Sequence, residues 1–281
     1  MGAYYLLLVP IGNDYASIPP RKLGPSGRAV IPTGFFPDGC AWSELCISEP
    51  SQPSRNAEWP SVSRRNWDAL HPQERAYVGD AVPLRRAQFA DARACARNAL
   101  TDLIGHDHAD TVIAKGERGM PLFPHGIVGS LTHTTGFRAA VVARTNTLKS
   151  IGVDAEVAKP LPDGVSNVVL TPRDLQNIAA VRQHGQQDVQ HNKSDPRFSS
   201  TEKILETVVF SAKEALYKSW FPLTHVFLDF AEADIELCHD GTLTASVHHD
   251  AACGTAPRTI RGRWMVSSGY VVTSTWITPI A

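Results

Sequence analysis

Two long helical patterns interrupt a chain that otherwise alternates like short β-strands, and this mixture limits the folds open to it. Residues 84–104 and 205–220 carry the helical period of about 3.6 residues, and Gly105 follows the first as a C-terminal cap. Strand-like alternation recurs at 127–131, 137–143, 148–156, 233–238, 242–247, 262–266 and 270–277. We therefore predict an α+β fold with antiparallel sheets.

Short connections predict how the strands pair and where the second helix begins and ends. The turns TTG and RTNT, at 134–136 and 144–147, predict that the three strands between 127 and 156 form one antiparallel meander. The segment SSTE at 199–202 fits a capping box that opens the second helix, and we expect Pro222 to end it.

Three segments lack a clear helical or strand period. Residues 10–65 are rich in Pro, Gly, Ser and Trp, and we expect irregular structure there with one short helix. Residues 183–200 are polar and predict a mobile loop. The opening MGAYYLLLVP is too short for a membrane span and lacks the basic start of a signal peptide, so we expect a first strand.

The composition is that of an ordinary globular protein without a strong overall charge. Hydrophobic residues make up 43%, which argues against a disordered chain. The net charge of -1 gives no global field toward nucleic acid or a membrane, so any anion site must be local. The five scattered cysteines include no C-x-x-C pair and indicate free thiols in the cytoplasm.

The segment IGVDAE could supply two metal ligands. On a strand, Asp154 and Glu156 point to the same side, where their charges repel unless a cation or protons lie between them. Mg²⁺ accepts such oxygen ligands and completes its shell with waters and phosphates. Glu214 on the second helix is a candidate third carboxylate. The alternatives are a solvated strand end and an exposed Glu214–Lys218 pair at i,i+4.

Lys213 lies inside the apolar arc of the second helix, where an ammonium group is unexpected. Together with Lys218 it flanks Glu214, and apolar surroundings would strengthen the contacts of both lysines with a polyphosphate. Alternatively, the stem of Lys213 lies along apolar neighbours while its ammonium group reaches water.

Two further groups of polar residues predict phosphate contacts. The segment GSLTH offers Ser130, Thr132 and His133 beside a turn. Arginines recur along one stripe of the first helix and suggest a guanidinium clamp: Arg86, Arg93 and Arg97. An incidental turn histidine and a solvated helix face are the alternatives.

Four blocks in this order resemble the 4′-phosphopantetheinyl transferases, particularly the enterobactin-synthetase component D type and the actinobacterial enzymes. The blocks are RRAQFADARACARNAL, KGERGMPLFPHGIVGSLTHTTGFRAAVVA, IGVDAEVAKPLPDGV and FSAKEALYKSWFPLT. The resemblance covers about residues 84–230. One departure is Met120, which stands where many relatives have a lysine.

The resemblance implies two similar α+β halves, residues 1–151 and 152–281, related by a pseudo-twofold with coenzyme A between them. It implies transfer of 4′-phosphopantetheine from coenzyme A to a serine of an apo acyl, peptidyl or polyketide carrier protein, with release of adenosine 3′,5′-bisphosphate. Magnesium, with manganese as an alternative, would be the cofactor. A cytoplasmic monomer that binds neither nucleic acid nor membrane is expected.

The resemblance also implies roles for single residues. Asp154, Glu156 and Glu214 map onto the metal ligands, and Lys213 and Lys218 onto lysines near the pyrophosphate and the attacking serine. The 3′-phosphate and nucleotide would contact Arg86, Arg93, His133 and Lys115. We expect Glu214 to act as the base, directly or through a water. The rival functions are a magnesium-dependent nucleotide phosphohydrolase and a non-catalytic carrier-binding protein of the same fold.

Overall fold

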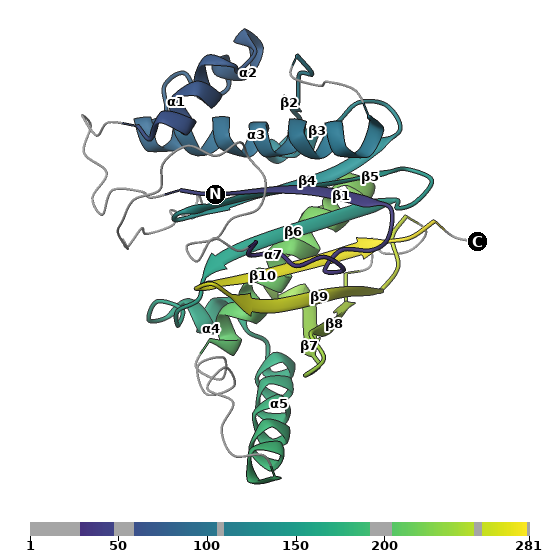
Figure 1. The fold of residues 1–281 in the computed structure, drawn as a ribbon. Coiled ribbons are helices and arrows are strands. Elements are labelled where there is room, and N and C mark those ends of the chain that lie inside the picture. The colour runs from purple at the N-terminus through teal and green to yellow at the C-terminus, as the bar shows by residue number, and fades with distance from the viewer. Residues whose placement is uncertain (1–28, 48–58, 106–109, 192–203, 250–254, 280–281) are drawn as a thin grey trace.

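A computed structural model describes residues 29–47, 59–105, 110–191, 204–249 and 255–279, and it has the predicted α+β fold. Its helices and antiparallel sheets are stacked in layers (Figure 1). Within these ranges, no helix combines the length and the apolar character that crossing a membrane requires.

The N-terminal part is a three-stranded sheet covered by one long helix. The sheet has the order β1-β5-β4, formed by Cys40–Cys46, Phe137–Arg144 and Ile127–Thr134. Helix α3, Pro83–Ile104, packs on it through Ala96, Ala99 and Leu100, and Gly105 caps it as predicted. The remaining elements of this part are α1 (Ser61–Asp68), α2 (Pro72–Ala76), β2 (Ala114–Lys115), η1 (Glu117–Gly119) and β3 (Pro121–Leu122).

The C-terminal part repeats this plan with a five-stranded sheet and a second long helix. Its strands have the order β6-β10-β9-β8-β7, formed by Ser150–Val157, Tyr270–Ile277, Thr259–Ser267, Thr242–Val247 and Ala233–Leu237. Helix α7, Leu205–Thr224, crosses behind β6 and β10 in Figure 1. The other helices of this part are α4 (Val165–Val169), α5 (Pro172–His191) and η2 (Phe230–Glu232).

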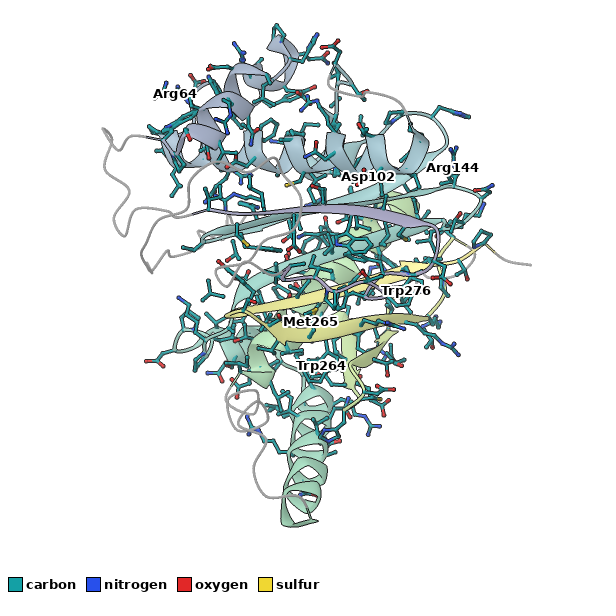
Figure 2. All side chains as sticks on the ribbon, in the orientation of Figure 1. Arg64, Asp102, Arg144, Trp264, Met265 and Trp276 are labelled. Carbon is teal, nitrogen blue, oxygen red and sulfur yellow. The ribbon has the colours of Figure 1, made fainter. Side chains whose placement is uncertain are left out.

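A shared apolar core joins the two parts. Phe137 and Val141 of β5 pack with Val153 of β6 and Val272 of β10, all of them fully buried. Partly buried side chains border this core, including Met265 and Trp276, which Figure 2 labels. Because alternate residues of a strand face opposite sides, the residues immediately before and after Val153 on β6 face α7 instead.

Strand β6 departs from the predicted meander. Strands β4 and β5 pair antiparallel as predicted, but β6 pairs with β10. Beside β4, the backbone N–H groups of Val153 and Ala155 donate to the hydroxyl oxygens of Ser130 and Thr132, at 3.1 and 3.0 Å. Side chains therefore take the place of a backbone ladder where the two sheets meet. A turn of four residues did not reveal this, because it constrains strand direction and not strand partners.

Several local predictions also need correction. Strand β1 falls within residues 10–65, where we expected irregular structure with one short helix. A short helix, α1, does begin there at Ser61, but it continues to Asp68. Helix α5 continues to His191 through part of the predicted loop. Helix α7 passes Pro222 and ends at Thr224, so the proline removes one i→i−4 hydrogen bond without ending the helix at the preceding residue. The predicted first strand and the predicted capping box lie outside the described residues.

Candidate active site

Asp154 on β6 faces α7 and is held by three side chains. Its Oδ1 accepts hydrogen bonds from Nζ of Lys218 at 2.7 Å and from Oγ1 of Thr132 at 3.3 Å. Its Oδ2 accepts a hydrogen bond from Oγ of Ser211 at 2.8 Å. The helix comes this close because Gly152 lacks a side chain: a Cβ there would lie 1.9 Å from the carbonyl oxygen of Ala215. The D-x-E pair is therefore no solvated strand end.

Glu156 and Glu214 join Asp154 in one electrostatic environment. Burial, the charge of Asp154 and the charge of Glu214 raise the pKa of Glu156 from 4.5 to about 8, against the opposing effect of Lys218. Burial and the charge of Asp154 likewise raise the pKa of Glu214. The predicted trio of carboxylates thus comes from two elements, β6 and α7, and carries more negative charge than Lys218 neutralises when all three are ionised.

This excess charge fits a divalent cation. Within the described ranges, no three His, Cys, Asp or Glu side chains are already gathered as a ready-made metal site. Mg²⁺ does not require one, because it commonly binds one or two carboxylates and completes its shell with waters and substrate phosphates. A cation among these carboxylates would favour their charged forms and so lower their raised pKa values. The donor set therefore suits magnesium together with a phosphorylated ligand.

Lys218 lies beside the carboxylates and is partly exposed, as a residue that binds a ligand must be. Besides Asp154, its ammonium group donates a hydrogen bond to the carbonyl oxygen of Val153 at 3.1 Å. Its side chain keeps 28% of its surface exposed, so a ligand can reach it. Lys218 pairs with Asp154 across α7 and β6, whereas the alternative considered from the sequence was an exposed pair with Glu214.

Lys213 does not reach this site, which corrects its predicted catalytic role. Its side chain is only 2% exposed, and its ammonium group is paired with Asp174 at 2.5 Å. It also donates hydrogen bonds to the carbonyl oxygens of Val169 and Phe230, at 2.9 and 2.8 Å. The predicted contact of Lys213 with a polyphosphate is wrong, as is the alternative of an ammonium group that reaches water.

A cluster of basic residues surrounds His133 at the end of β4. The guanidinium group of Arg85 contacts Nε2 of His133. Because arginine can only donate, Nε2 accepts and the ring proton lies on Nδ1, which can donate to an anion. Burial and the charges of Arg85, Arg138 and Lys218 hold the pKa of His133 well below its ordinary value. The neighbouring cations attract an incoming phosphate, and the neutral histidine can donate a hydrogen bond to it.

Arg85 was missed from the sequence, and its neighbour Arg86 was chosen instead. The side chain of Arg86 donates hydrogen bonds to the carbonyl oxygens of Ala81 and Gly79 and lies over the ring of Trp67. Arg86 therefore fastens the start of α3 to the preceding loop. Spacing does not separate the two arginines: at about 100° per residue, Arg86 lies within about 20° of the direction of Arg93, whereas Arg85 lies about 80° from it. Only the fold reveals that Arg85 contacts His133.

Arg93 and Arg97 are largely buried, so the solvated-face alternative is wrong for both. Arg93 donates a hydrogen bond to the carbonyl oxygen of Ile113 at 3.2 Å and lies over the ring of Phe89. Burial lowers the pKa of Arg93 to about 10, and the charges of Arg97 and Arg85 contribute. Arg97 pairs with the fully buried Glu74. Arg93 thus lies within the electrostatic influence of Arg85, whereas Arg97 holds α2 against α3.

The other predicted phosphate contacts have different surroundings. Ser130 and Thr132 are buried, and their hydroxyl oxygens accept hydrogen bonds from the backbone of β6. Lys115 lies exposed on the β2–β3 hairpin. This hairpin reaches the end of α7, where Nδ1 of His225 lies 3.2 Å from Oε2 of Glu117.

Acidic groups that suit a cation, beside basic groups that suit a phosphate, are typical of enzymes that act on phosphorylated substrates. Comparison with known families places the chain among them. Residues 73–143 match the 4′-phosphopantetheinyl transferase N-terminal domain, and residues 150–273 match the 4′-phosphopantetheinyl transferase superfamily.

Three actinobacterial relatives agree with this assignment. The chain is 39% identical over 208 residues to the 4′-phosphopantetheinyl transferase Svp of Streptomyces mobaraensis, covering 73% of this chain and 77% of Svp. It is 35% identical to Npt of Nocardia iowensis, covering 73% and 87%. It is 36% identical to PptT of Mycobacterium tuberculosis, covering 72% and 84%. The chain therefore belongs to the 4′-phosphopantetheinyl transferase superfamily, and the predicted resemblance is confirmed.

Proposed function

We propose that this transferase moves 4′-phosphopantetheine from coenzyme A to a serine of an apo carrier protein, with magnesium held by Asp154, Glu156 and Glu214. The observation that carries the proposal is the electrostatic coupling of these three carboxylates around a single ammonium group, that of Lys218. Bound magnesium would supply Lewis acidity at the pyrophosphate of coenzyme A.

The residues of the chain provide the remaining chemistry. Glu214 takes the proton of the carrier serine, directly or through a water, because a bound cation favours the charged carboxylate that can accept a proton. The serine Oγ forms a bond to the phosphorus next to pantetheine, and the bond from that phosphorus to the bridging oxygen breaks. The electron pair leaves with adenosine 3′,5′-bisphosphate, whose new charge Lys218 stabilises.

The basic cluster provides the nucleotide side of the site. Arg85 and the Nδ1–H group of His133 would bind the 3′-phosphate of coenzyme A, and Arg93 adds positive charge. Arg85 takes the role that the sequence had assigned to Arg86. Lys115 stays a predicted nucleotide contact, since its hairpin lies on the side of α7 that carries the site.

The proposed function also concerns the class of carrier, the oligomeric state and the cellular location. We propose that the carriers of fatty-acid, polyketide, siderophore and other peptide synthetases are all candidate substrates. We propose a monomer, because the two halves of the site lie in one chain. We also propose a cytoplasmic location, supported by the free thiols of Cys40, Cys46, Cys95 and Cys238 among the described residues.

The test is intact-mass spectrometry of a panel of apo carriers after incubation with the protein, coenzyme A and magnesium. We expect a phosphopantetheine adduct on at least one carrier serine and loss of transfer when EDTA is added. Free phosphopantetheine without an adduct would favour the phosphohydrolase. Binding of carriers without any product would favour the non-catalytic protein.

The matched variant is Asp154→Asn, which keeps the shape of a side chain that Ser211, Thr132 and Lys218 contact. Alanine would leave those partners without an acceptor and confound activity with folding. We expect transfer to fall by at least about 100-fold. Undiminished magnesium-dependent transfer by the folded variant would refute the assignment of the metal ligands.

A further inference from the structure

The ammonium group of Lys213 has no hydrogen-bonding capacity left for a substrate. A lysine ammonium group has three protons. The structure provides three acceptors, which are a carboxylate oxygen of Asp174 at 2.5 Å and the carbonyl oxygens of Val169 and Phe230 at 2.9 and 2.8 Å. These acceptors come from α5, from the end of α4 and from η2. Lys213 is therefore the point where α7 is fastened to three neighbouring elements.

Asp174 extends this connection to the edge of the sheet. Its Oδ1 accepts a hydrogen bond from the backbone N–H of Ile235 in β7, at 2.7 Å. Its Oδ2 accepts one from the backbone N–H of Thr171 at 2.9 Å, and Oγ1 of Thr171 accepts one from the backbone N–H of Asp174 at 3.1 Å. This reciprocal arrangement caps the start of α5. Asp174 is fully buried, so its charge depends on Lys213 for compensation.

The connection lies on the side of α7 that faces away from Asp154. At about 100° per residue, Lys213 points about 200° away from Ser211, whereas Lys218 points within about 20° of it. Ser211 and Lys218 both contact Asp154. Helix α7 is thus held on two opposite sides, by the contacts with β6 and β10 on one and by Lys213 on the other. Glu214 lies between the two directions, and its orientation depends on both.

We propose that Lys213 and Asp174 are a positioning pair, which sets the rotation of α7 and thereby the place of Glu214, without contact to coenzyme A or the carrier. This inference rests on the proposed function, because Glu214 is positioned for the reaction described above. It replaces the catalytic role that the sequence suggested for Lys213. A helix rotation that moves a carboxylate by about 1 Å can lower the rate about 100-fold, because reacting groups need close alignment.

The primary test is Asp174→Asn, since the amide keeps the size of the side chain and its acceptor for Ile235, and α5 carries no predicted nucleotide contact. Lys213→Met is the reciprocal variant, and Lys149→Met is the matched control, because Lys149 is exposed on the turn before β6. For each variant, kcat and the Kd of coenzyme A are measured well below the unfolding midpoint, and the midpoint itself by thermal scanning.

We expect both Asp174→Asn and Lys213→Met to lower kcat about 10- to 100-fold while the Kd of coenzyme A changes less than about threefold. The Tm should fall by roughly 10 °C in Lys213→Met, which leaves a buried carboxylate unpaired. Lys149→Met should match the wild type in all three measurements. Unchanged kcat in both variants would show that the pair is merely structural and overturn the proposal. A tenfold weaker Kd for coenzyme A in Lys213→Met alone would show a phosphate contact and also overturn it.

The double variant Lys213→Met/Asp174→Asn removes both charges at once. We expect it to recover much of the Tm lost in Lys213→Met and to raise kcat above that of the same single variant, because no uncompensated charge then remains to displace the helix. A recovered Tm without any recovery of kcat would refute positioning.

The same variants separate this inference from the proposed function. If the wild type transfers nothing to any carrier, the proposed function fails, and the role of Lys213 and Asp174 in positioning a base fails with it. The double-mutant cycle in Tm then still reports whether the pair is coupled. If the wild type is active and only the expected kcat losses are missing, the positioning role alone is refuted.

Discussion

Replacing Arg85 or Arg86 by alanine should distinguish two neighbours that the sequence alone does not separate. Arg85 is exposed, contacts His133 and is proposed to bind the 3′-phosphate of coenzyme A. A hydrogen bond to a charged group contributes about 1.5–3 kcal/mol, and exposure to solvent places Arg85 near the lower end. About 1.5–2 kcal/mol corresponds to a Kd for coenzyme A that is roughly 10- to 30-fold weaker.

Isothermal titration with coenzyme A and with 3′-dephospho-coenzyme A isolates the contribution of the 3′-phosphate. Arg85→Ala should weaken coenzyme A selectively and leave the affinity for the dephospho compound within about twofold. Arg86→Ala is the internal control, because its side chain binds the carbonyl oxygens of Gly79 and Ala81. It should lower stability by about 1–2 kcal/mol without selective loss of coenzyme A. Equal weakening of both ligands by Arg85→Ala, or a selective loss in Arg86→Ala, would refute the assignment.

Three further predictions address the base, the carboxylate trio and the α2–α3 contact. Glu214→Gln should lower kcat about 100-fold or more in the carrier assay, because the amide cannot accept the serine proton. In the absence of metal, Tm should fall as pH rises from 5 to 8. The pKa of Glu156 is about 8 in the folded protein against an ordinary 4.5, so over this range the folded state keeps a proton that the unfolded state has lost, and folding becomes less favourable as pH rises. Added Mg²⁺ should therefore raise Tm more at pH 8 than at pH 6, and an equal shift would count against a carboxylate metal site. Glu74→Gln should lower the free energy of unfolding by about 2–3 kcal/mol in urea titrations, because it removes the charge that compensates Arg97.

The sequence by itself determined the features that arise from neighbouring residues. The helical period and Gly105 predicted α3, and the same period predicted most of α7. The spacing of Asp154 and Glu156 predicted that both carboxylates lie on one side of a strand, and the order of four blocks predicted the family. These features depend on backbone geometry over a few residues, or on short contiguous motifs and their order. Both can be recognised in the sequence without knowledge of the fold.

Only the tertiary structure decided which side chains meet. Lys213 and Asp174 are 39 positions apart in sequence, and no local pattern predicted that the lysine would be buried against that carboxylate. The contact of Arg85 with His133 likewise joins α3 to β4, and the hydroxyls of Ser130 and Thr132 bind β6 because two sheets meet there. The physical reason is that a side chain's partners depend on how helices and sheets pack. The identity of the residue limits only the kind of partner it can accept.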